Sequence, residues 1–434
     1  MTTTDVTPED ESTGTRARTV LTASLIGTTI EWYDFFLFAT AASIVFPQLF
    51  FPAGDETVGT LLSFATFAVG FVARPIGGIL FGHLGDRVGR KATLVSTMLL
   101  AGLATALIGL LPSYATIGLW APILLVVLRV LGGIALGGEW AGAVLMAVEY
   151  APPGRRGLWG SSPQIGLGLG LSLGTGAFAL LGGAMDDRAF LDWGWRIAFL
   201  VSVLLVVVGL VVRLAVLETP AFRRMQDSAD VARVPVVEVV RDEPSRRNLG
   251  LGLLARWAEG AAFNTWGVFV LTYAVTTVRM PRSEVLVAVT IAGLVSAVVV
   301  PLAGHLADRF GRRAVFAAGA VAFGVGVYPA FLGLSTGSLV VVTVVLVLLL
   351  GVVYGVQSGA EAPLFAELFP ARTRYTGMSL VYQGSGIYAS GLTPLILTSL
   401  LAVTGGSPWL ACAFLVLTAV VSVVATRALR PVEL

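Results

Sequence analysis

GHLGDRVGRK, at Gly82–Lys91, is a short basic stretch between two long apolar segments, and it recurs as GHLADRFGRR at Gly304–Arg313. The two copies lie a little over half the chain apart. A ten-residue pattern of this kind does not recur by chance, so the chain consists of two related halves. A second repeat supports this, because EYAPPGRRG begins at Glu149 and ELFPARTRYTG begins at Glu367.

The composition is that of a membrane protein. Of the 434 residues, 56% are hydrophobic and 12% are charged, and the mean hydropathy is +0.87. Soluble globular chains do not approach these values. A helix needs about 20 mostly apolar residues to span a bilayer, and the chain offers twelve such runs. They lie near residues 20–46, 58–81, 92–111, 117–140, 158–183, 195–216, 248–278, 285–303, 314–334, 337–360, 376–401 and 408–428.

These runs predict helices, because backbone groups in lipid must find hydrogen-bond partners within their own segment and the runs lack the alternation of barrel strands. We therefore expect an all-α integral membrane protein with twelve transmembrane helices in two six-helix halves. The expected parts are a cytoplasmic N-terminal tail (1–19), an N-terminal bundle (20–217), a cytoplasmic linker (218–247), a C-terminal bundle (248–428) and a cytoplasmic C-terminal tail (429–434).

The basic residues predict the orientation in the membrane. Arginine and lysine gather in every second loop, whereas the opposite loops carry acidic residues such as Asp55 and Asp186 and few bases. Because basic loops stay on the cytoplasmic side, both termini are expected in the cytoplasm of a multi-pass plasma-membrane protein. Residues 1–18 are polar and lack a cleavage signal, so the first apolar helix is expected to remain.

Ionisable residues within the apolar runs indicate function, because they are costly in lipid. Glu31 and Asp34 share one helix turn at the expected mid-depth of the first run, and Arg129 lies near mid-depth in the fourth. Two adjacent carboxylates repel each other, so one is expected to carry the coupling proton; Asp34 is preferred slightly over Glu31, and Glu259 is the rival. A substrate anion would then replace the carboxylate on Arg129. A purely structural pair remains the alternative.

An anion site is expected between the halves, built from polar and aromatic residues at mid-depth. These residues are Tyr33, Arg129, Gln164, Arg256, Asn264, Trp266, Tyr382 and Gln383. The planar fork of an arginine suits a carboxylate. Two alternatives stay open: Arg256 and Glu259, at i and i+3, can form a local ion pair, and Gln164 can serve a helix-to-helix hydrogen bond. Arg74 is instead expected to reach toward the cytoplasmic surface.

The sequence offers little for catalysis. His83 and His305 occupy matching places in the repeated stretch, which indicates loop structure, and Cys412 is the only cysteine. The glycine runs lie inside membrane-length apolar segments, which argues against dinucleotide loops. We therefore expect no enzyme activity, cofactor, metal or nucleic-acid partner. The expected partners are a small metabolite, protons and the bilayer, with the monomer as the functional unit.

The repeated stretch is the loop signature of the major facilitator superfamily. Further stretches resemble the metabolite:proton symporter family, which includes shikimate, α-ketoglutarate, citrate, dicarboxylate and proline/betaine carriers. They are IEWYDFFLF, ARPIGGILFGHLGDRVGRK, LGGEWAGAVLMAVEYAPPGRRG, WGWRIAFL, LETPAF and RYTGMSLVYQGSGIYASGLTPLI. The resemblance implies proton-coupled uptake of a small, usually carboxylated metabolite by alternating access.

The substrate stays open within this resemblance. Gly260 stands where many relatives have Asn, and Gln383 where Asn is frequent. Symport of a zwitterionic osmolyte such as proline or betaine is one alternative. Proton-driven efflux is another, although SPQIGLGLGLSLGTG lacks the Gly-Pro-Gly-Gly type of motif expected for it.

The repeated stretches are expected to act as cytoplasmic gates. The gating residues are Asp86, Arg87, Arg90, Glu149, Asp308, Arg309, Arg312 and Glu367. Asp86 with Arg90, and the matching pair of the second copy, are expected to join the halves by charge-assisted bonds in the outward-open state. The alternative is that the arginines merely hold these loops inside the cell.

Overall fold

The computed structural model describes the backbone of residues 8–51, 55–88, 90–137, 139–149, 151–152, 154–215, 235–370 and 373–432. Side chains are described in the same ranges except at residues 8–24, 82–94, 139, 146, 149, 212–215 and 235. Within the described ranges the chain forms helices and no strands. This confirms the all-α fold class.

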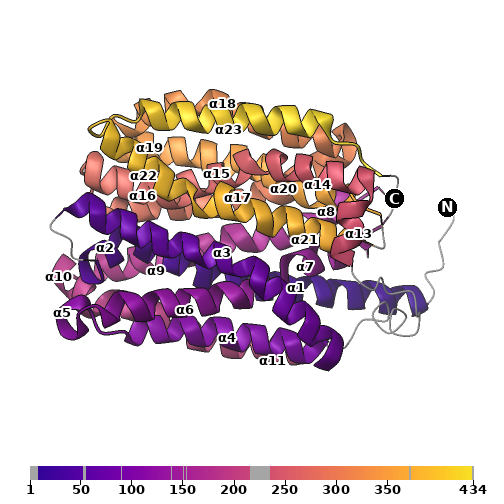
Figure 1. The fold of residues 1–434 in the computed structure, drawn as a ribbon, viewed down its shortest axis with the longest axis horizontal. Coiled ribbons are helices and arrows are strands. Elements are labelled where there is room, and N and C mark those ends of the chain that lie inside the picture. The colour runs from indigo at the N-terminus through magenta and orange to yellow at the C-terminus, as the bar shows by residue number, and fades with distance from the viewer. Residues whose placement is uncertain are drawn as a thin grey trace.

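The first half runs along the lower part of the molecule in Figure 1, in indigo to magenta. Its helices are α1 (Pro8–Ile44), α2 (Phe46–Leu49), α3 (Glu56–Val88), α4 (Arg90–Leu110), α5 (Tyr114–Ile117), α6 (Trp120–Leu136), α7 (Glu139–Glu149), α8 (Arg156–Gly160), α9 (Ser162–Ala184), α10 (Asp187–Ala189), the π-helical η1 (Phe190–Gly194) and α11 (Trp195–Ala215).

The second half lies above it in Figure 1, in orange to yellow. Its helices are α13 (Pro235–Arg241), α14 (Glu243–Ala255), α15 (Trp257–Asn264), η2 (Thr265–Phe269), α16 (Val270–Thr272), η3 (Tyr273–Thr277), α17 (Arg282–Phe310), α18 (Arg312–Leu334), α19 (Leu339–Leu346), η4 (Val347–Tyr354), α20 (Gly355–Ala366), α21 (Arg374–Ser385), η5 (Gly386–Gly391), α22 (Thr393–Val403) and α23 (Trp409–Ala428).

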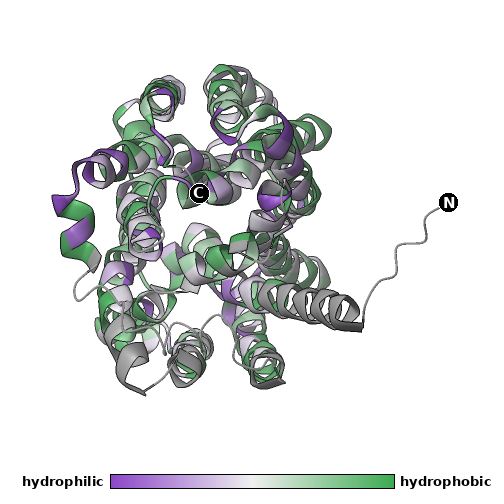
Figure 2. Ribbon diagram, turned by 90° about the vertical axis from the view of Figure 1, so that its right-hand side faces the viewer, coloured by the Kyte–Doolittle hydropathy of each residue, from purple (hydrophilic) through white to green (hydrophobic). Residues whose placement is uncertain are grey.

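The twelve apolar runs of the sequence all appear as helices, which confirms the twelve-helix bundle. Nine stretches within the described ranges are long and apolar enough to cross a membrane, and Val95–Leu110 is a shorter apolar helix. Large apolar side chains such as Leu180, Val325 and Val403 are exposed on the outside of the bundle. Figure 2 views the bundle along its helices, and much of the ribbon on the outside has the green colour of hydrophobic residues. Such a surface suits contact with lipid.

The helices extend further than hydropathy predicts. Helix α1 begins at Pro8, inside the expected tail 1–19, because polar residues are as compatible with a helix as apolar ones and proline suits a first turn. The repeated stretch is mostly helical rather than a turn: in the second copy α17 continues to Phe310. The break falls at Gly311, whose φ of 91° is in the region that favours glycine.

Helix α9 joins the two halves, packing against both α1 and α17. A Cβ at Gly170 would lie 2.5 Å from the Cβ of Trp32 on α1, and a Cβ at Gly168 would lie 2.9 Å from the backbone of Ala297 on α17. Glycine therefore allows close approach on two faces of α9. This packing brings α1 and α17 to the same central interface.

Candidate functional site

A cavity lies between the two halves near the middle of the bundle. It is narrow in this conformation, with about 20 Å³ of room for the centre of a water-sized sphere. Its lining comes from α1, α3 and α9 in the first half and from α14–α15, η4, α21 and η5 in the second. The lining residues are Trp32, Phe35, Phe71, Arg74, Leu167, Arg256, Glu259, Gly260, Phe263, Asn264, Tyr354, Tyr382, Gly386 and Ser390. The expected residues Arg256, Glu259, Asn264 and Tyr382 are therefore brought together.

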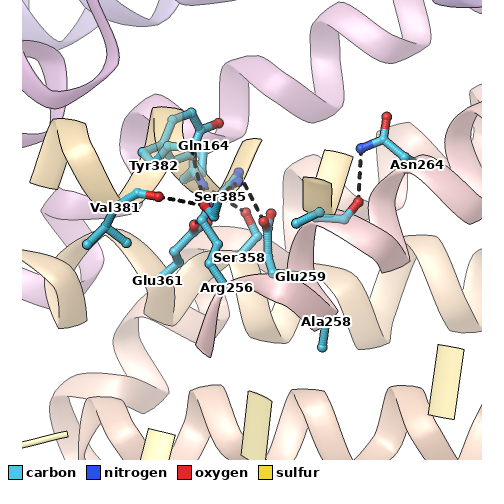
Figure 3. Close-up of polar contacts among 12 residues, drawn as sticks. Gln164, Arg256, Ala258, Glu259, Asn264, Ser358, Glu361, Val381, Tyr382 and Ser385 are labelled. Atoms are coloured by element: carbon cyan, nitrogen blue, oxygen red, sulfur yellow. Dashed lines mark hydrogen bonds and ion pairs between the residues drawn. The ribbon is translucent and has the colours of Figure 1, made fainter. Parts of the chain in front are cut away.

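Arg256 is the centre of a buried ion cluster, at the junction of α14 and α15. Its Nε lies 2.7 Å from Oε1 of Glu361 on α20, and its Nη2 lies 3.1 Å from Oε2 of Glu259. Its Nη1 donates a hydrogen bond of 3.2 Å to Ser385 Oγ (Figure 3). All three charged side chains are at most 5% exposed. One guanidinium thus faces two carboxylates out of water.

The ion cluster is tied to the first half by a chain of hydrogen bonds. Gln164 Nε2 donates to Glu361 Oε2 at 3.0 Å and to Ser358 Oγ at 3.1 Å, and Gln164 Oε1 accepts from Trp140 Nε1 at 2.9 Å. The Trp140 ring stacks on Tyr382, with centroids 3.8 Å apart. Gln164 therefore bridges the halves, which is the helix-to-helix role left open by the sequence.

Arg74 on α3 lines the cavity, contrary to the expectation that it reaches the cytoplasmic surface. It is 5% exposed, and its Cζ lies 4.6 Å, 4.7 Å and 5.6 Å from the ring centroids of Phe71, Phe35 and Trp32. Within the described ranges its Nε has no hydrogen-bond partner. Glu31 acts on it electrostatically. The first half thus presents an arginine to the cavity, held by aromatic faces.

Arg129 is not among the cavity-lining residues. Its guanidinium lies over Phe38, Phe35 and Phe67, with Cζ 4.2–5.2 Å from the ring centroids. Its Nε and Nη2 have no hydrogen-bond partner within the described part of the chain. A Cβ at Gly70 would lie 2.3 Å from the Arg129 Nε, so the glycine makes room for this side chain between α3 and α6. The structure therefore places Arg129 in an aromatic cage inside the first half.

The carboxylates of the first helix face a second cavity, between α1, α4, α6 and α11. Glu31 and Asp34 both line it. Asp34 Oδ1 accepts a hydrogen bond of 2.6 Å from Ser202 Oγ on α11. The structure thus separates these two residues from the central cavity, although they share one helix turn as expected.

Three other expected residues lie outside the central lining. The Tyr33 hydroxyl donates to the Ala198 carbonyl at 2.8 Å. Trp266 is fully buried against Phe323 and Phe331. Gln383 Nε2 donates to the Gly137 carbonyl at 2.9 Å, which is a further contact between halves. The structure gives these side chains packing and bridging roles.

Two residues of the site were not predicted from the sequence. Glu361 is completely buried beside Arg256, and Tyr354 lines the cavity. A signal for Glu361 was present, because it is a single carboxylate inside the tenth apolar helix, and the rule applied to Glu31 and Asp34 applies equally there. Tyr354 carries no such signal, since tyrosine is compatible with lipid, interface or core.

Three of the residues expected at the gate, Asp308, Arg312 and Glu367, make contacts at the end of the bundle where α8 and α13 lie, on the right in Figure 1, which we call the linker end. Asp308 Oδ1 accepts from Gly157 N at 2.7 Å and Oδ2 from Leu158 N at 3.0 Å, so α17 is bound to the start of α8. Arg312 pairs with Glu367 and lies 3.6 Å from Asp308, within the second half.

The remaining expected gating residues make no described contribution to this contact. Arg309 is exposed. The side chains of Asp86, Arg87, Arg90 and Glu149 lie outside the described residues. Among the described side chains, Asp308 and the backbone amides of Gly157 and Leu158 make the contact between the halves here.

The halves also meet at the opposite end, where α2 and α10 lie (Figure 1). Ser43 Oγ donates to the Val268 carbonyl at 3.2 Å, and Thr272 Oγ1 donates to the Ser43 carbonyl at 3.2 Å. Thr175 and Thr290 share a hydrogen bond of 2.8 Å. The central cavity thus lies between two sets of hydrogen bonds that join the halves, one at each end of the bundle.

Comparison with known proteins agrees with this architecture. The chain is 43% identical over 396 residues to the inner membrane metabolite transport protein YhjE of Escherichia coli (strain K12), covering 89% of each chain. It is 39% identical over 394 residues to the shikimate transporter of the same strain, covering 90% of each. The xylose transporter XylE from E. coli, in a partially occluded inward-open structure, has the same fold, with a TM-score of 0.71 at 18% identity over 94% of this chain and 97% of that one.

Family models cover nearly all of the chain. The sugar (and other) transporter model matches residues 19–248, and the major facilitator superfamily model matches residues 253–433. The first match covers the first half and ends within α14, and the second match covers the rest of the second half. With relatives more than 30% identical along most of its length, the chain belongs to the major facilitator superfamily of transporters.

Proposed function

We propose that this transporter is a proton-coupled symporter of a small organic anion and that the anion binds in the central cavity. One observation carries the proposal: the two arginines and the one carboxylate that line this cavity are joined by a second carboxylate, Glu361, which lies behind the lining on Arg256. Arg74 and Arg256 are 5% and 4% exposed, and Glu259 and Glu361 are 2% and 0% exposed. Two cations and two carboxylates leave no net charge.

This balance couples an anion to a proton. An uncompensated charge in a site shielded from water is costly, so an anion that entered alone would leave the cavity with one uncompensated negative charge. A proton on one carboxylate restores neutrality. Anion and proton then cross together, because a cavity that holds only one of them carries a net charge.

Glu259 is the proposed proton carrier at this cavity. It lines the cavity, and its Oε2 is 3.1 Å from Arg256 Nη2 but has no partner with hydrogen-bond geometry in the described ranges. Glu361 instead accepts from both Arg256 and Gln164. Asp34, in the second cavity, is the competing proton site. The variants of both residues considered in the Discussion separate them.

An inward proton gradient sets the direction of transport, and the proposed orientation says which end of the bundle releases the substrate. With both termini in the cytoplasm, the linker end faces inward, and the Asp308 contact with α8 is a cytoplasmic gate. Opening this gate after the anion and proton have bound from outside releases both inward. In this proposal the protein takes up its substrate across the cytoplasmic membrane by alternating access.

Uptake into proteoliposomes tests the proposal. Labelled shikimate, lactate, succinate and betaine are compared with and without an inward proton gradient, and with an uncoupler added. We expect a carboxylate to accumulate only under the gradient, up to about tenfold per pH unit for one proton. Accumulation of betaine alone, equal carboxylate uptake with the uncoupler, or gradient-driven export would contradict the proposal.

A further inference from the structure

The two arginines of the cavity differ in what already neutralises them. Arg256 lies within 3.1 Å of oxygens of two carboxylates. Arg74 is held by aromatic rings and, in the described part of the chain, has no carboxylate at ion-pair distance, and its Nε has no hydrogen-bond partner. Aromatic faces leave the in-plane donors of a guanidinium available. A carboxylate entering the cavity therefore finds its open partner in Arg74.

Asn264, a second lining residue, has a buried hydrogen-bond acceptor that lacks a donor in the described part of the chain. Asn264 is 3% exposed, and its Nδ2 donates to the Gly260 carbonyl at 2.9 Å. That carbonyl can only accept, so the side-chain NH2 of Asn264 must face it. Oδ1 therefore points away from this hydrogen bond. Within the described ranges Oδ1 has no partner. A buried carbonyl oxygen without a donor is costly, so this position calls for an N–H or O–H group. Figure 3 shows Asn264 to one side of the ion cluster.

The rest of the lining restricts the body of the ligand. Trp32, Phe71 and Phe263 contribute apolar ring surface. Glu259, which takes up one proton in the proposed function, lines the same cavity. A second carboxylate on the ligand would need a second proton, because Arg256, the other cation of the lining, is already paired with two carboxylates. A quaternary ammonium would meet Arg74 without offering Asn264 a donor. One anionic group, one hydroxyl donor and an apolar body match what the cavity presents.

We infer that the substrate class is a hydroxylated monocarboxylate, whose carboxylate binds Arg74 and whose hydroxyl donates to Asn264 Oδ1. This inference rests on the proposed function, since it takes the cavity to bind an anion. It assigns the anion to Arg74 rather than to Arg256. It also makes Asn264 the residue that distinguishes hydroxy acids from plain acids.

Equilibrium binding to the purified full-length transporter tests both assignments. Two pairs of probes differ by one hydroxyl: 3-hydroxybenzoate with benzoate, and lactate with propionate. We expect the better-fitting pair to show about tenfold tighter binding of the hydroxy acid. Asn264→Leu should reduce that preference to within about twofold while the plain acid keeps its Kd.

Arginine variants test the anion partner. Arg74→Gln should weaken both acids of a pair at least tenfold, and Arg74→Lys, which keeps the charge but loses the planar fork, should weaken them less. Arg129→Lys is the matched control, because Arg129 is an equally buried arginine that also contacts Phe35 but does not line the cavity. It should leave both Kd values within about twofold. Thermal unfolding of each variant shows that it is folded.

The outcomes separate this inference from the proposed function. If carboxylates bind but Asn264→Leu keeps the hydroxyl preference, or Arg74→Gln and Arg74→Lys both keep wild-type affinity, the inference is overturned and anion symport stands. Equal binding of plain and hydroxy acids by the wild-type protein overturns it in the same way. If betaine binds and no carboxylate does, the inference and the proposed function both fall.

Discussion

Replacing Asp308 with Asn tests the proposed gate at the linker end. The carboxylate accepts from Gly157 N at 2.7 Å and from Leu158 N at 3.0 Å, one hydrogen bond on each oxygen. An amide keeps one oxygen and turns an NH2 group toward the other backbone N–H. The substitution therefore removes one charge-assisted bond between α17 and α8 and weakens the other, while changing the side-chain volume little.

The expected magnitude follows from these two bonds. A hydrogen bond to a charged group contributes about 1.5–3 kcal/mol. Losing one such bond shifts the balance between the closed and open linker end by roughly ten- to a hundredfold. The shift favours the open form, because the contact exists only when α17 lies against α8. If the arginines merely hold loops inside the cell, Asp308→Asn has no such effect.

A cysteine at Ser161 reports the opening. Ser161 is fully buried, and a Cβ on Gly304 would lie 2.6 Å from its Oγ, so it lies at this contact between halves. In a Cys412→Ala background, labelling of Ser161→Cys from the linker side should speed up at least tenfold with Asp308→Asn. Arg309→Gln, at an exposed neighbouring position, is the matched control and should leave the rate unchanged. An unchanged rate in Asp308→Asn, in protein that folds normally, would refute the gating argument.

Three further changes test the site. Glu259→Gln should abolish gradient-driven uptake, retain counterflow and make carboxylate affinity independent of pH; if Asp34→Asn alone does so, the proton belongs to the second cavity. Trp140→Phe removes the 2.9 Å hydrogen bond to Gln164 and should lower stability by about 1 kcal/mol in thermal unfolding, whereas no change would mean that the bridge adds nothing. Gly304→Val would meet Gly157 O at a Cβ distance of 2.6 Å and should slow transport by keeping the linker end open, which thiol labelling at the linker end can contradict.

The sequence was sufficient for the fold because lipid restricts it strongly. Twelve apolar runs could only be helices, and the repeated stretch related the two halves. The boundaries followed less well, because hydropathy reports where lipid ends and not where a helix ends. Helix α1 and helix α17 both extend beyond their apolar runs, since polar residues form helices equally well outside the membrane.

The sequence predicts how deep in the membrane the site residues lie, but not toward which neighbour their side chains point. Depth along the helices predicts that Arg129 lines the cavity and that Arg74 reaches the surface, whereas Arg74 lines the cavity and Arg129 lies outside its lining. What decides is the rotation of α3 and α6 about their own axes. That rotation is fixed by close packing, since a Cβ at Gly77 would lie 1.8 Å from the Ile134 carbonyl oxygen. Backbone approach of this kind involves residues distant in sequence, and hydropathy contains no term for it.

The reversal also changes how coupling works. If a carboxylate of α1 and the substrate anion competed for Arg129, as the sequence predicts, a proton on that carboxylate would free the guanidinium for the anion. With the anion on Arg74 and the proton on Glu259, the two occupy separate places in one cavity and each compensates the charge of the other. Binding is then mutually favourable, and the linkage is reciprocal, so that the factor by which a proton tightens anion binding equals the factor by which the anion tightens proton binding. A cavity lined by an arginine without a carboxylate partner among the described residues and by a carboxylate that can take up a proton is therefore suited to carry both together.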